Sequence, residues 1–560
     1  MGKKRKRRKL KKKKLFIAIV ILAVLILFVV FLIGKGINLT KSIVIPEKTY
    51  YLANTDSSVM LYTYDSENDK LKESDVLPRG TKIKSKKQDF KTFSENKYYL
   101  IKYQDKSYYL EEKYFVSDKK KIVEETSRFV RTSVTVYKNE TDSKIASFIK
   151  KGNELKILGY DSVAADGNVN MYQISLNDIT GWVYGKYLVS TKELADAVYN
   201  ENGTYDIHKD RHYSRELYGG SAATLDYYPY KKEEFEGNSL MKDAKTMYIN
   251  AGMIGAIDTY LDIAVNNSVN AIVVDIKDGA LAYPAEIAKE YSPTAYSSYI
   301  NELDVYKATI DKIKDAGIYV IGRIVVFNDS HYAADHPEDC ISSSSWPSAY
   351  SRGAWEYNVG LAKESIKTFG FNEIQFDYVR FPENAYNLST SGADFKNVYG
   401  EEKAEAVQNF LFYAADQIHK EKAYFSVDVF GECSSEYVTA YGQYWPAISN
   451  VVDVISSMPY TDHFGRSIDT WTNAYNTVYN WALGAATRQT EIPTPAIPRT
   501  WITAYDTPYW NPTITYGAAK IMDQAQALRD AGLMGGFITW NGRSSIDKYQ
   551  QIKSAFAKNY

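Results

Sequence analysis

The 560-residue sequence has little or nothing of several features that mark particular classes of protein. Its two cysteines, Cys340 and Cys433, are too few for a disulfide framework, although one bridge could form if the fold brought them together. We expect two free thiols, because loop insertions should keep these residues apart. The sequence has no G-x-S-x-G motif and no glycine-rich phosphate loop. These absences disfavour a serine nucleophile and a nucleotide-binding sheet.

Acidic residues are absent from the start of the chain, where residues 3–14 contain eleven Lys and Arg. The whole sequence has no net charge, but the remainder carries 57 basic and 68 acidic residues, a formal charge of −11. An acidic body argues against a nucleic-acid partner. Beside an apolar segment, the basic run is expected to set membrane orientation and to bind anionic lipid headgroups.

Residues 15–33 form an apolar run of nineteen residues without a charge. This length is enough to cross a hydrocarbon core of about 30 Å. The positive-inside rule predicts that residues 1–14 are cytoplasmic and that everything beyond the span lies outside, as in a single-pass protein of the cell membrane. A cleaved signal peptide is the alternative. The following GKGINLT offers no small-x-small cleavage site, so we expect an uncleaved anchor.

Short alternating apolar and polar runs, separated by polar turns, fill the next part of the chain and predict all-β structure. One order of strand, Gly-marked turn, Tyr-rich hairpin and closing aromatic strand occurs twice, ending in KSYYLEEKYFVS and in ITGWVYGKYLVS. The two segments look like small bacterial SH3-like barrels, at residues 45–118 and 124–190. Such modules commonly bind cell-wall peptide or glycan, and a role as spacers is equally open. Residues 191–241 are predicted to be an irregular connector.

From residue 242 to residue 560, strands alternate with helices, which is typical of an α/β fold. Eight candidate strands are the number in a (β/α)8 TIM barrel, with longer loops after strands 3, 4 and 7. An open doubly wound sheet is the alternative, and the missing phosphate loop disfavours it. The candidate strands are 246–252, 270–279, 319–329, 372–381, 424–432, 453–460, 494–502 and 535–541.

The fourth of these strands, FNEIQFDYVRFP, carries the clearest functional signal. With a period of two, Ile374 and Phe376 face the helices, while Gln375 and Asp377 face the barrel interior. Pro382 cannot donate to a sheet ladder, so the strand should stop about there. A carboxylate at the carboxyl end of a barrel strand is where TIM-barrel enzymes keep their catalytic groups.

Neighbouring strands repeat this pattern. The same alternation points further polar side chains inward, namely Asp275, Lys277, Arg323, Ser426 and Asp428. Buried charges need partners and seldom add stability, so the cluster is better explained by chemistry than by folding.

Paired carboxylates predict glycoside hydrolysis, in which one group protonates the leaving oxygen and the other attacks the sugar or activates water. Asp377 is the candidate nucleophile or base, and Arg323 and Lys277 would keep it ionised. Asp428 is the first candidate for the acid by geometry. Glu432, at the tip of strand 5, is the second.

The remaining candidates are predicted to bind substrate. Asp275 and Asp278 would bind sugar hydroxyls, while Tyr460, Trp540 and Asn541 would form stacking and hydrogen-bonding subsites. The full predicted substrate-binding set is Asp275, Lys277, Asp278, Arg323, Arg380, Tyr460, Trp540 and Asn541.

Two other functions stay open at this point. A metal-dependent deacetylase could use His331, Asp335 and His336 after strand 3 with His463 after strand 6, although this spacing is not that of a helical metal pair. A non-catalytic barrel that binds cell wall or polysaccharide is the second alternative. The preferred hypothesis requires no metal and no cofactor.

Several segments between residues 246 and 541 carry a resemblance to a known family, namely VVDIKDG, GRIVVFND, FNEIQFDYVRFPE and SVDVFGE. They resemble a bacterial family of uncharacterised glycoside hydrolase-like TIM barrels, whose members are often extracytoplasmic, and FDYVRFP is the specific part. The resemblance implies a TIM barrel and a carbohydrate substrate. We therefore expect a membrane-anchored, outward-facing glycoside hydrolase that acts on cell-envelope or extracellular polysaccharide, peptidoglycan included.

Overall fold

The computed structural model describes residues 2–34, 46–197, 205–211, 218–342, 344–464, 467–507 and 512–560. The chain divides into two compact units. The first holds residues Met1–Glu124 and Val163–Asn168, and the second holds Glu125–Ser162 and Val169–Tyr560.

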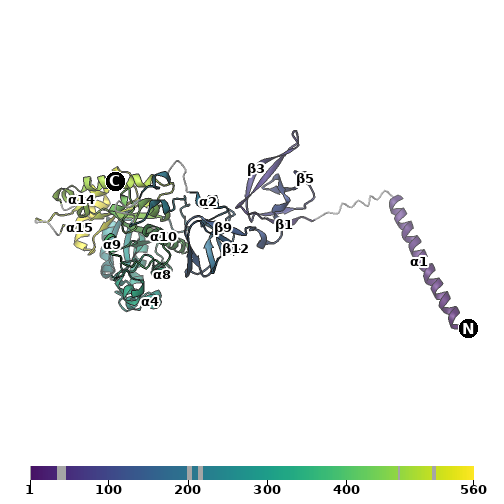
Figure 1. Ribbon diagram of the computed structural model, residues 1–560, viewed down its shortest axis with the longest axis horizontal. Helices are drawn as coiled ribbons and strands as arrows, with labels where there is room; N and C mark the ends of the chain where they lie inside the picture. The colour runs from purple at the N-terminus through teal and green to yellow at the C-terminus, as the bar shows by residue number, and fades with distance from the viewer. Residues whose placement is uncertain are drawn as a thin grey trace. The chain divides into compact units, whose positions relative to one another are not determined.

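The first unit begins with helix α1 (Gly2–Gly34), drawn in purple at the N-terminus in Figure 1. By length and composition its segment Lys12–Phe31 can cross a membrane, and a signal sequence has the same properties. Large apolar side chains such as Leu15, Phe16 and Leu27 are more than half exposed. The protein itself therefore does not bury this apolar surface within the described residues.

Two antiparallel sheets complete the first unit. Strand β1 (Lys48–Leu52) lies between β4 (Lys82–Ser85) and β8 (Phe115–Val116). The second sheet has the order β3 (Lys70–Pro78), β2 (Ser58–Asp65), β7 (Lys106–Glu111), β6 (Asn96–Tyr103) and β5 (Phe90–Phe93). At the β6–β7 turn, Gln104 and Asp105 both have positive φ, at 46° and 63°, as a two-residue type I′ hairpin requires.

The second unit starts with a seven-stranded antiparallel sheet, called here the second β region. Its order is β11-β10-β14-β13-β12-β9-β15. The strands are β9 (Ser127–Val130), β10 (Val134–Tyr137), β11 (Ile145–Ile149), β12 (Glu154–Tyr160), β13 (Met171–Leu176), β14 (Ile179–Tyr184) and β15 (Leu188–Val189). The prediction of all-β structure before the barrel is confirmed. That the two regions are SH3-like barrels stays a prediction.

The second β region packs against the barrel through helix α10 (Lys403–Lys420). The hydroxyl of Tyr187 donates to both carboxylate oxygens of Asp416 at 3.0 Å, and Lys186 Nζ lies 2.5 Å from the same carboxylate. Tyr137 stacks on Tyr413, with ring centroids 6.0 Å apart. Because Asp416 and Tyr187 are both buried, these contacts fix the sheet on the barrel.

Replacing Asp416 by Ala is expected to lower the free energy of unfolding by about 2 kcal/mol, because the buried Tyr187 hydroxyl loses its acceptor. Urea unfolding of the full-length chain, followed by tryptophan fluorescence, measures this change. The matched control is Asp196→Ala in helix α2 (Lys192–Asp196), whose partner Lys192 is exposed. It should leave the midpoint unchanged. Equal midpoints for the two variants would contradict the expectation.

The rest of the second unit is a parallel barrel. Its strands follow one another around the axis in the order β16, β17, β19, β20, β21, β22, β23, β24 and β25, and β25 pairs with β16 to close it. Strands β23 and β24 are two halves of one seventh strand that is interrupted at Arg499, so the predicted (β/α)8 fold is confirmed. The bounds are β16 (Ala244–Ile249), β17 (Ala271–Asp278), β19 (Tyr319–Val325), β20 (Glu373–Asp377), β21 (Tyr424–Phe430), β22 (Val454–Met458), β23 (Ile497–Pro498), β24 (Thr500–Thr503) and β25 (Gly536–Trp540).

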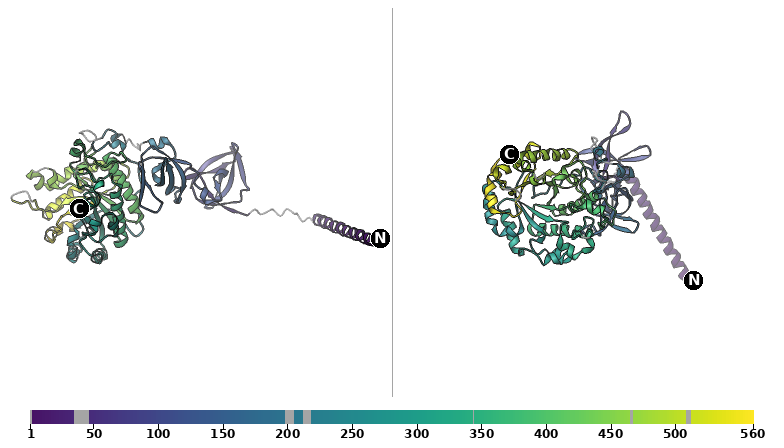
Figure 2. Two further views of the ribbon diagram at one scale, coloured as in Figure 1. Left: turned by 60° about the horizontal axis from the view of Figure 1, so that its bottom comes forward. Right: turned by 60° about the vertical axis from the view of Figure 1, so that its left-hand side comes forward.

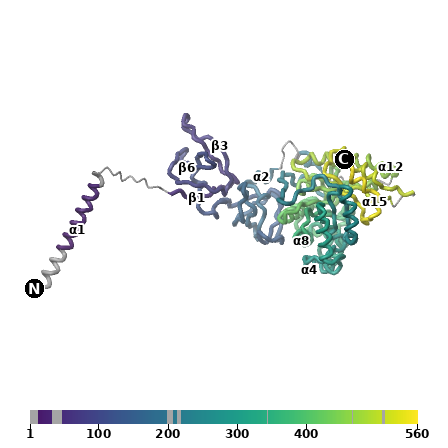
Figure 3. The backbone as a smooth tube through the Cα atoms, turned by 180° about the vertical axis from the view of Figure 1, so that it is seen from behind, coloured from purple at the N-terminus to yellow at the C-terminus, as the bar shows by residue number. Residues whose placement is uncertain are grey.

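Helices surround this barrel, as the right-hand view of Figure 2 shows, and Figure 3 traces the same path from teal to yellow. The larger ones are α3 (Ile257–Asn266), α6 (Leu303–Asp315), α8 (Arg352–Phe369), α10, α11 (Trp445–Val451), α13 (Ala474–Gln489), α14 (Ala518–Asp530) and α15 (Ile546–Ala557). Shorter helices lie in the loops, including α4 (Glu286–Tyr291), α7 (Ser330–Asp335), α9 (Ala385–Thr390) and α12 (Ile468–Thr472).

Two local features differ from the predicted strands. Strand β20 ends at Asp377 rather than at Pro382, because Tyr378 adopts the left-handed backbone conformation with φ 55°. In β17 a bulge lies between Asp275 and Lys277, so the strict alternation of faces stops there. Both irregularities lie at the carboxyl ends of the strands, where the candidate site is found.

Candidate active site

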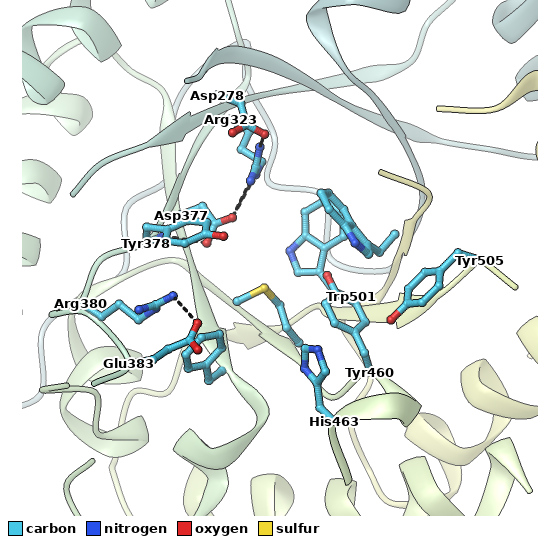
Figure 4. A pocket seen from close by; sticks show the side chains of 13 residues that line it. Asp278, Arg323, Asp377, Tyr378, Arg380, Glu383, Tyr460, His463, Trp501 and Tyr505 are labelled. Carbon is cyan, nitrogen blue, oxygen red and sulfur yellow. Dashed lines mark hydrogen bonds and ion pairs between the residues drawn. The ribbon is translucent and has the colours of Figure 1, made fainter. Parts of the chain in front are cut away.

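A pocket of about 350 Å³ opens at the carboxyl ends of the barrel strands. Figure 4 shows it from close by. It is lined by Asp278, Arg323, Asp377, Tyr378, Arg380, Glu383, Phe430, Met458, Tyr460, His463, Trp501, Tyr505 and Trp540.

Arg323, on β19, organises the charges of this pocket. Its Nη2 and Nε lie 2.6 and 3.2 Å from one oxygen of Asp377, and its Nη1 lies 2.7 Å from Asp275 and 3.1 Å from Asp278. Strands β17, β19 and β20 are neighbours: Asp275 is the register partner of Arg323, and Asp377 lies two residues beyond Gln375, the partner of Arg323 on β20. The two-residue period therefore puts Arg323 and Asp377 on the same face of the sheet. The guanidinium is buried, and its hydrogen-bonding groups are committed to carboxylates.

Asp377 is the last residue of β20, the position predicted for it. It is 4% exposed, and the second carboxylate oxygen accepts a hydrogen bond from the backbone N–H of Tyr378 at 2.6 Å. The left-handed turn at Tyr378 therefore both ends the strand and fixes the carboxylate. One cation and one backbone donor hold Asp377 in an orientation open to the pocket.

The pocket has two unlike walls (Figure 4). Asp278, Asp377 and Glu383 lie along one wall with their arginine partners. Within the described part of the chain, the Glu383 carboxylate forms one ion pair, with Arg380 at 3.3 Å. The facing wall carries the aromatic rings of Tyr460, His463, Trp501 and Tyr505. The ring of Trp540, another lining residue, packs against Tyr460 and Trp501. A sugar ring has apolar faces and a rim of hydroxyls, and such a pair of walls matches both.

Asp428, on β21, lies beneath this pocket and does not line it. Trp501 Nε1 donates to one of its oxygens at 2.7 Å, and the other oxygen lies 3.9 Å from Arg323 Nε. Burial and the negative charge of Asp377 raise the pKa of Asp428 well above its usual range. This shift favours the protonated form of Asp428, whose hydrogen bond from Nε1 holds the Trp501 ring in place.

Asp275 also belongs to the layer under the pocket. Tyr248 donates to it at 2.5 Å, and Arg323 binds its other oxygen. Burial raises the pKa of Asp275 to about 6 despite the opposing effect of Arg323. Asp275 thus orients Arg323 and is not among the residues that reach the pocket.

Lys277 does not lie near Asp377, contrary to the prediction. The bulge in β17 pairs it with Ile324 and turns it outward, where it forms a buried ion pair with Asp329 and a 2.7 Å hydrogen bond to Asn358 of α8. The same bulge turns Asp278 into the pocket in its place.

Two more predicted residues lie outside the pocket lining. Glu432 accepts hydrogen bonds from Tyr437 and Tyr441, each at 2.8 Å, and Asn541 exchanges hydrogen bonds with the backbone of Ser545 at the start of α15. Four members of the predicted substrate-binding set do line the pocket with Arg323, namely Asp278, Arg380, Tyr460 and Trp540.

Sequence reasoning missed several lining residues. Trp501 could have been found, because it follows the inward alternation of the seventh strand. Tyr378, Glu383 and Tyr505 come from loops that follow the strands, and no periodic signal points to them.

The alternative metal site is not assembled. His331 Nδ1 contacts the carbonyl of Gly279, His336 contacts the carbonyl of Tyr291, and Asp335 accepts hydrogen bonds from Ser292 and Thr294. No group of three or more His, Cys, Asp or Glu suited to a metal ion occurs among the described residues. The two cysteines are both buried and unpaired, as predicted.

A closed (β/α)8 barrel with arginine-bound carboxylates at the carboxyl ends of its strands, facing aromatic rings, has the architecture of a TIM-barrel glycosidase. A family model described as “Putative glycosyl hydrolase domain” matches residues 246–546. The match covers more than half of the chain, and the chain belongs to this family of glycoside hydrolases.

Solved structures with similar folds were also found. A hypothetical protein from Ruminiclostridium thermocellum is 29% identical over 33% of this chain and 97% of its own, with a TM-score of 0.28. The PgaB glycoside hydrolase domain from Bordetella bronchiseptica is 11% identical over 57% of this chain and 100% of its own, with a TM-score of 0.42. The C-terminal domain of a “putative chitinase” from Desulfitobacterium hafniense is 11% identical over 56% of this chain and 99% of its own, with a TM-score of 0.38. No curated protein matches the chain.

Proposed function

We propose that this chain is a membrane-anchored, extracytoplasmic glycoside hydrolase that cleaves cell-envelope or extracellular polysaccharide with a pair of carboxylates. The observation that carries the proposal is Asp377, held by Arg323 on the charged wall of a pocket whose opposite wall is aromatic. Asp377 acts as the nucleophile or as the base that activates water.

The proton donor needs a second carboxyl group that can reach the leaving oxygen. Three of the described lining residues are carboxylates, and two of them, Asp278 and Asp377, are held by hydrogen bonds from Arg323. The side chain of Glu383 is 73% exposed, and among the described residues its carboxylate pairs with Arg380 alone, at 3.3 Å, so it is free to approach a substrate. Asp428 and Glu432, the predicted acids, do not line the pocket. We therefore propose Glu383 as the proton donor in their place. Asp278 keeps its predicted role of binding sugar hydroxyls.

Glu383→Gln tests this assignment through its dependence on the leaving group. Hydrolysis of unactivated oligosaccharides should fall by about 10²-fold or more, while aryl glycosides with acidic phenol leaving groups, which need no protonation, should be cleaved nearly as before. Kinetics of both substrate types measure the effect. Asp311→Asn, in an exposed ion pair with Lys307 on α6, is the control and should change neither. Equal losses on both substrate types would assign the role of acid elsewhere.

Membrane orientation gives a separate prediction. If residues 1–14 stay in the cytoplasm and α1 is retained, protease added to intact cells should remove a C-terminal tag and leave an N-terminal tag intact. Disrupting the cells should expose both tags, which controls for access. Protection of the C-terminal tag in intact cells would contradict the outward-facing arrangement, and release of the chain into the medium would contradict retention of the anchor.

A further inference from the structure

A second depression lies beside the active-site pocket, over helices α12 and α13. Its volume is about 510 Å³. One edge is formed by Phe464, which follows directly after the pocket residue His463 in the turn Thr461–Phe464. Consecutive Cα atoms are about 3.8 Å apart, so residues that line the two cavities are direct neighbours in the chain at this point. It is called the side groove below.

Asparagine side chains line the side groove. Asn473, Asn476 and Asn480 lie along it, and the last two are four residues apart on one face of α13. Asn473 has a structural explanation, because its side-chain oxygen accepts a hydrogen bond from the backbone N–H of Asn476 and caps the helix. The amides of Asn476 and Asn480 are exposed and have no hydrogen-bond partner within the described part of the chain.

Two exposed asparagines within α13, without hydrogen-bond partners among the described residues, do not favour the helix. Asn is a weaker helix former than Ala, because its side chain competes for backbone hydrogen bonds. Within the described part of the chain, neither amide forms a hydrogen bond that would compensate for this lower helix propensity. A ligand whose groups both donate and accept hydrogen bonds would explain the choice of residue.

Aromatic side chains complete the side groove. Phe464 is 39% exposed there, and Trp481 forms part of the lining with its indole N–H already donated to the carbonyl of Gly431 at 2.8 Å. Apart from Asp469, the described lining residues are uncharged. Trp481 is buried, so Phe464 supplies the exposed ring. Amides beside an exposed ring suit the hydroxyl and acetamido groups and the apolar face of a neutral saccharide.

We propose that the side groove binds an uncharged segment of the polysaccharide whose bond is cleaved in the neighbouring pocket. This inference rests on the proposed function as a glycoside hydrolase. Binding in the side groove would make the enzyme selective for polysaccharide chains long enough to occupy both the pocket and the groove. Once one end of such a chain is bound in the pocket, its binding to the groove is intramolecular.

The test is the double variant Asn476→Ala/Asn480→Ala, made in full-length Asp377→Asn protein so that substrate survives. Ala favours the helix, so the variant should fold at least as well as its parent. Calorimetric titration uses hexasaccharides of β-1,4-linked N-acetylglucosamine and of β-1,4-linked glucose, each beside its disaccharide. Hexasaccharide affinity should fall about fivefold or more, while disaccharide affinity should not change. Gln550→Ala removes an exposed amide from α15, outside the side groove, and should change neither affinity.

Unchanged hexasaccharide affinity in the double variant would overturn the inference, as would a parent that binds none of the hexasaccharides. A groove that docks a protein instead of a glycan would give the first of these results. The proposed function is tested separately by hydrolysis with Asp377 intact. If a polysaccharide is cleaved and the double variant cleaves it equally well, only the side-groove inference fails. If nothing is cleaved while hexasaccharide binding still depends on the two asparagines, only the proposed function fails.

Discussion

Asp377→Asn is expected to reduce glycoside hydrolysis by about 10³-fold or more while the fold stays intact. The amide keeps the shape of the carboxylate and can still accept the hydrogen bond from the N–H of Tyr378. It cannot attack the anomeric carbon or take a proton from water. Hydrolysis of envelope polysaccharide by parent and variant, with thermal unfolding of both, measures the two effects.

The variant also separates an enzyme from a protein that only binds polysaccharide. A binding protein should give no hydrolysis with Asp377 present, so there would be no activity for the substitution to remove. If turnover is seen and survives the substitution, Asp377 is not the reacting group. Adding azide to Asp377→Gly distinguishes the two reaction types, because a glycosyl azide should form where the lost carboxylate was a nucleophile.

Asp377 also affects its buried neighbour. Its negative charge contributes to the raised pKa of Asp428, so removing that charge should lower the pKa of Asp428 towards its usual range. Titration of the carboxyl carbon by NMR in parent and variant would detect the change. Relief of this repulsion should offset the lost ion pair with Arg323, so we expect nearly the same free energy of unfolding in parent and variant.

The second large effect is expected for Arg323→Met. Asp275 and Asp377 are buried and share this one guanidinium, so its loss leaves two carboxylates without a cation in a low-dielectric layer. Breaking a buried ion pair from one side costs about 3–5 kcal/mol of unfolding free energy. Hydrolysis should also be lost, because nothing then orients Asp377. Urea unfolding at pH 7.5 measures the first effect.

The loss of unfolding free energy in Arg323→Met, relative to the parent, should depend on pH. Folding raises the pKa of Asp275 from its ordinary 3.8 to about 6, so the stability that it contributes is present below pH 4 and is lost as the pH rises through 6. Arg323 is the main influence that lowers this pKa, so its removal raises the pKa further. The unfolding free energy lost in Arg323→Met should therefore be larger at pH 7.5 than at pH 5. The control is Arg529→Met, which breaks a partly exposed ion pair with Asp243. It should lose little unfolding free energy, and the loss should be the same at both pH values.

Local patterns in the sequence were sufficient for the architecture. Nineteen uncharged apolar residues after eleven basic ones predict a helix of membrane-spanning length, and eight strand–helix alternations predict a closed barrel. The two-residue period also placed Asp275, Arg323, Asp377 and Asp428 on one side of their strands. These inferences succeed because period, charge and order along the chain are properties of neighbouring residues.

Tertiary structure alone decided which of these residues reach the pocket. A one-residue bulge in β17 exchanges Lys277 for Asp278 in the pocket lining, and Trp501, which donates a hydrogen bond to Asp428, lines the pocket where Asp428 does not. Neither a bulge nor a contact between strands far apart in the chain leaves a periodic signal in the sequence, because both depend on how the strands pair around the closed barrel. Glu383 and Tyr505 enter the pocket from loops, whose paths are set by contacts between residues far apart in the chain.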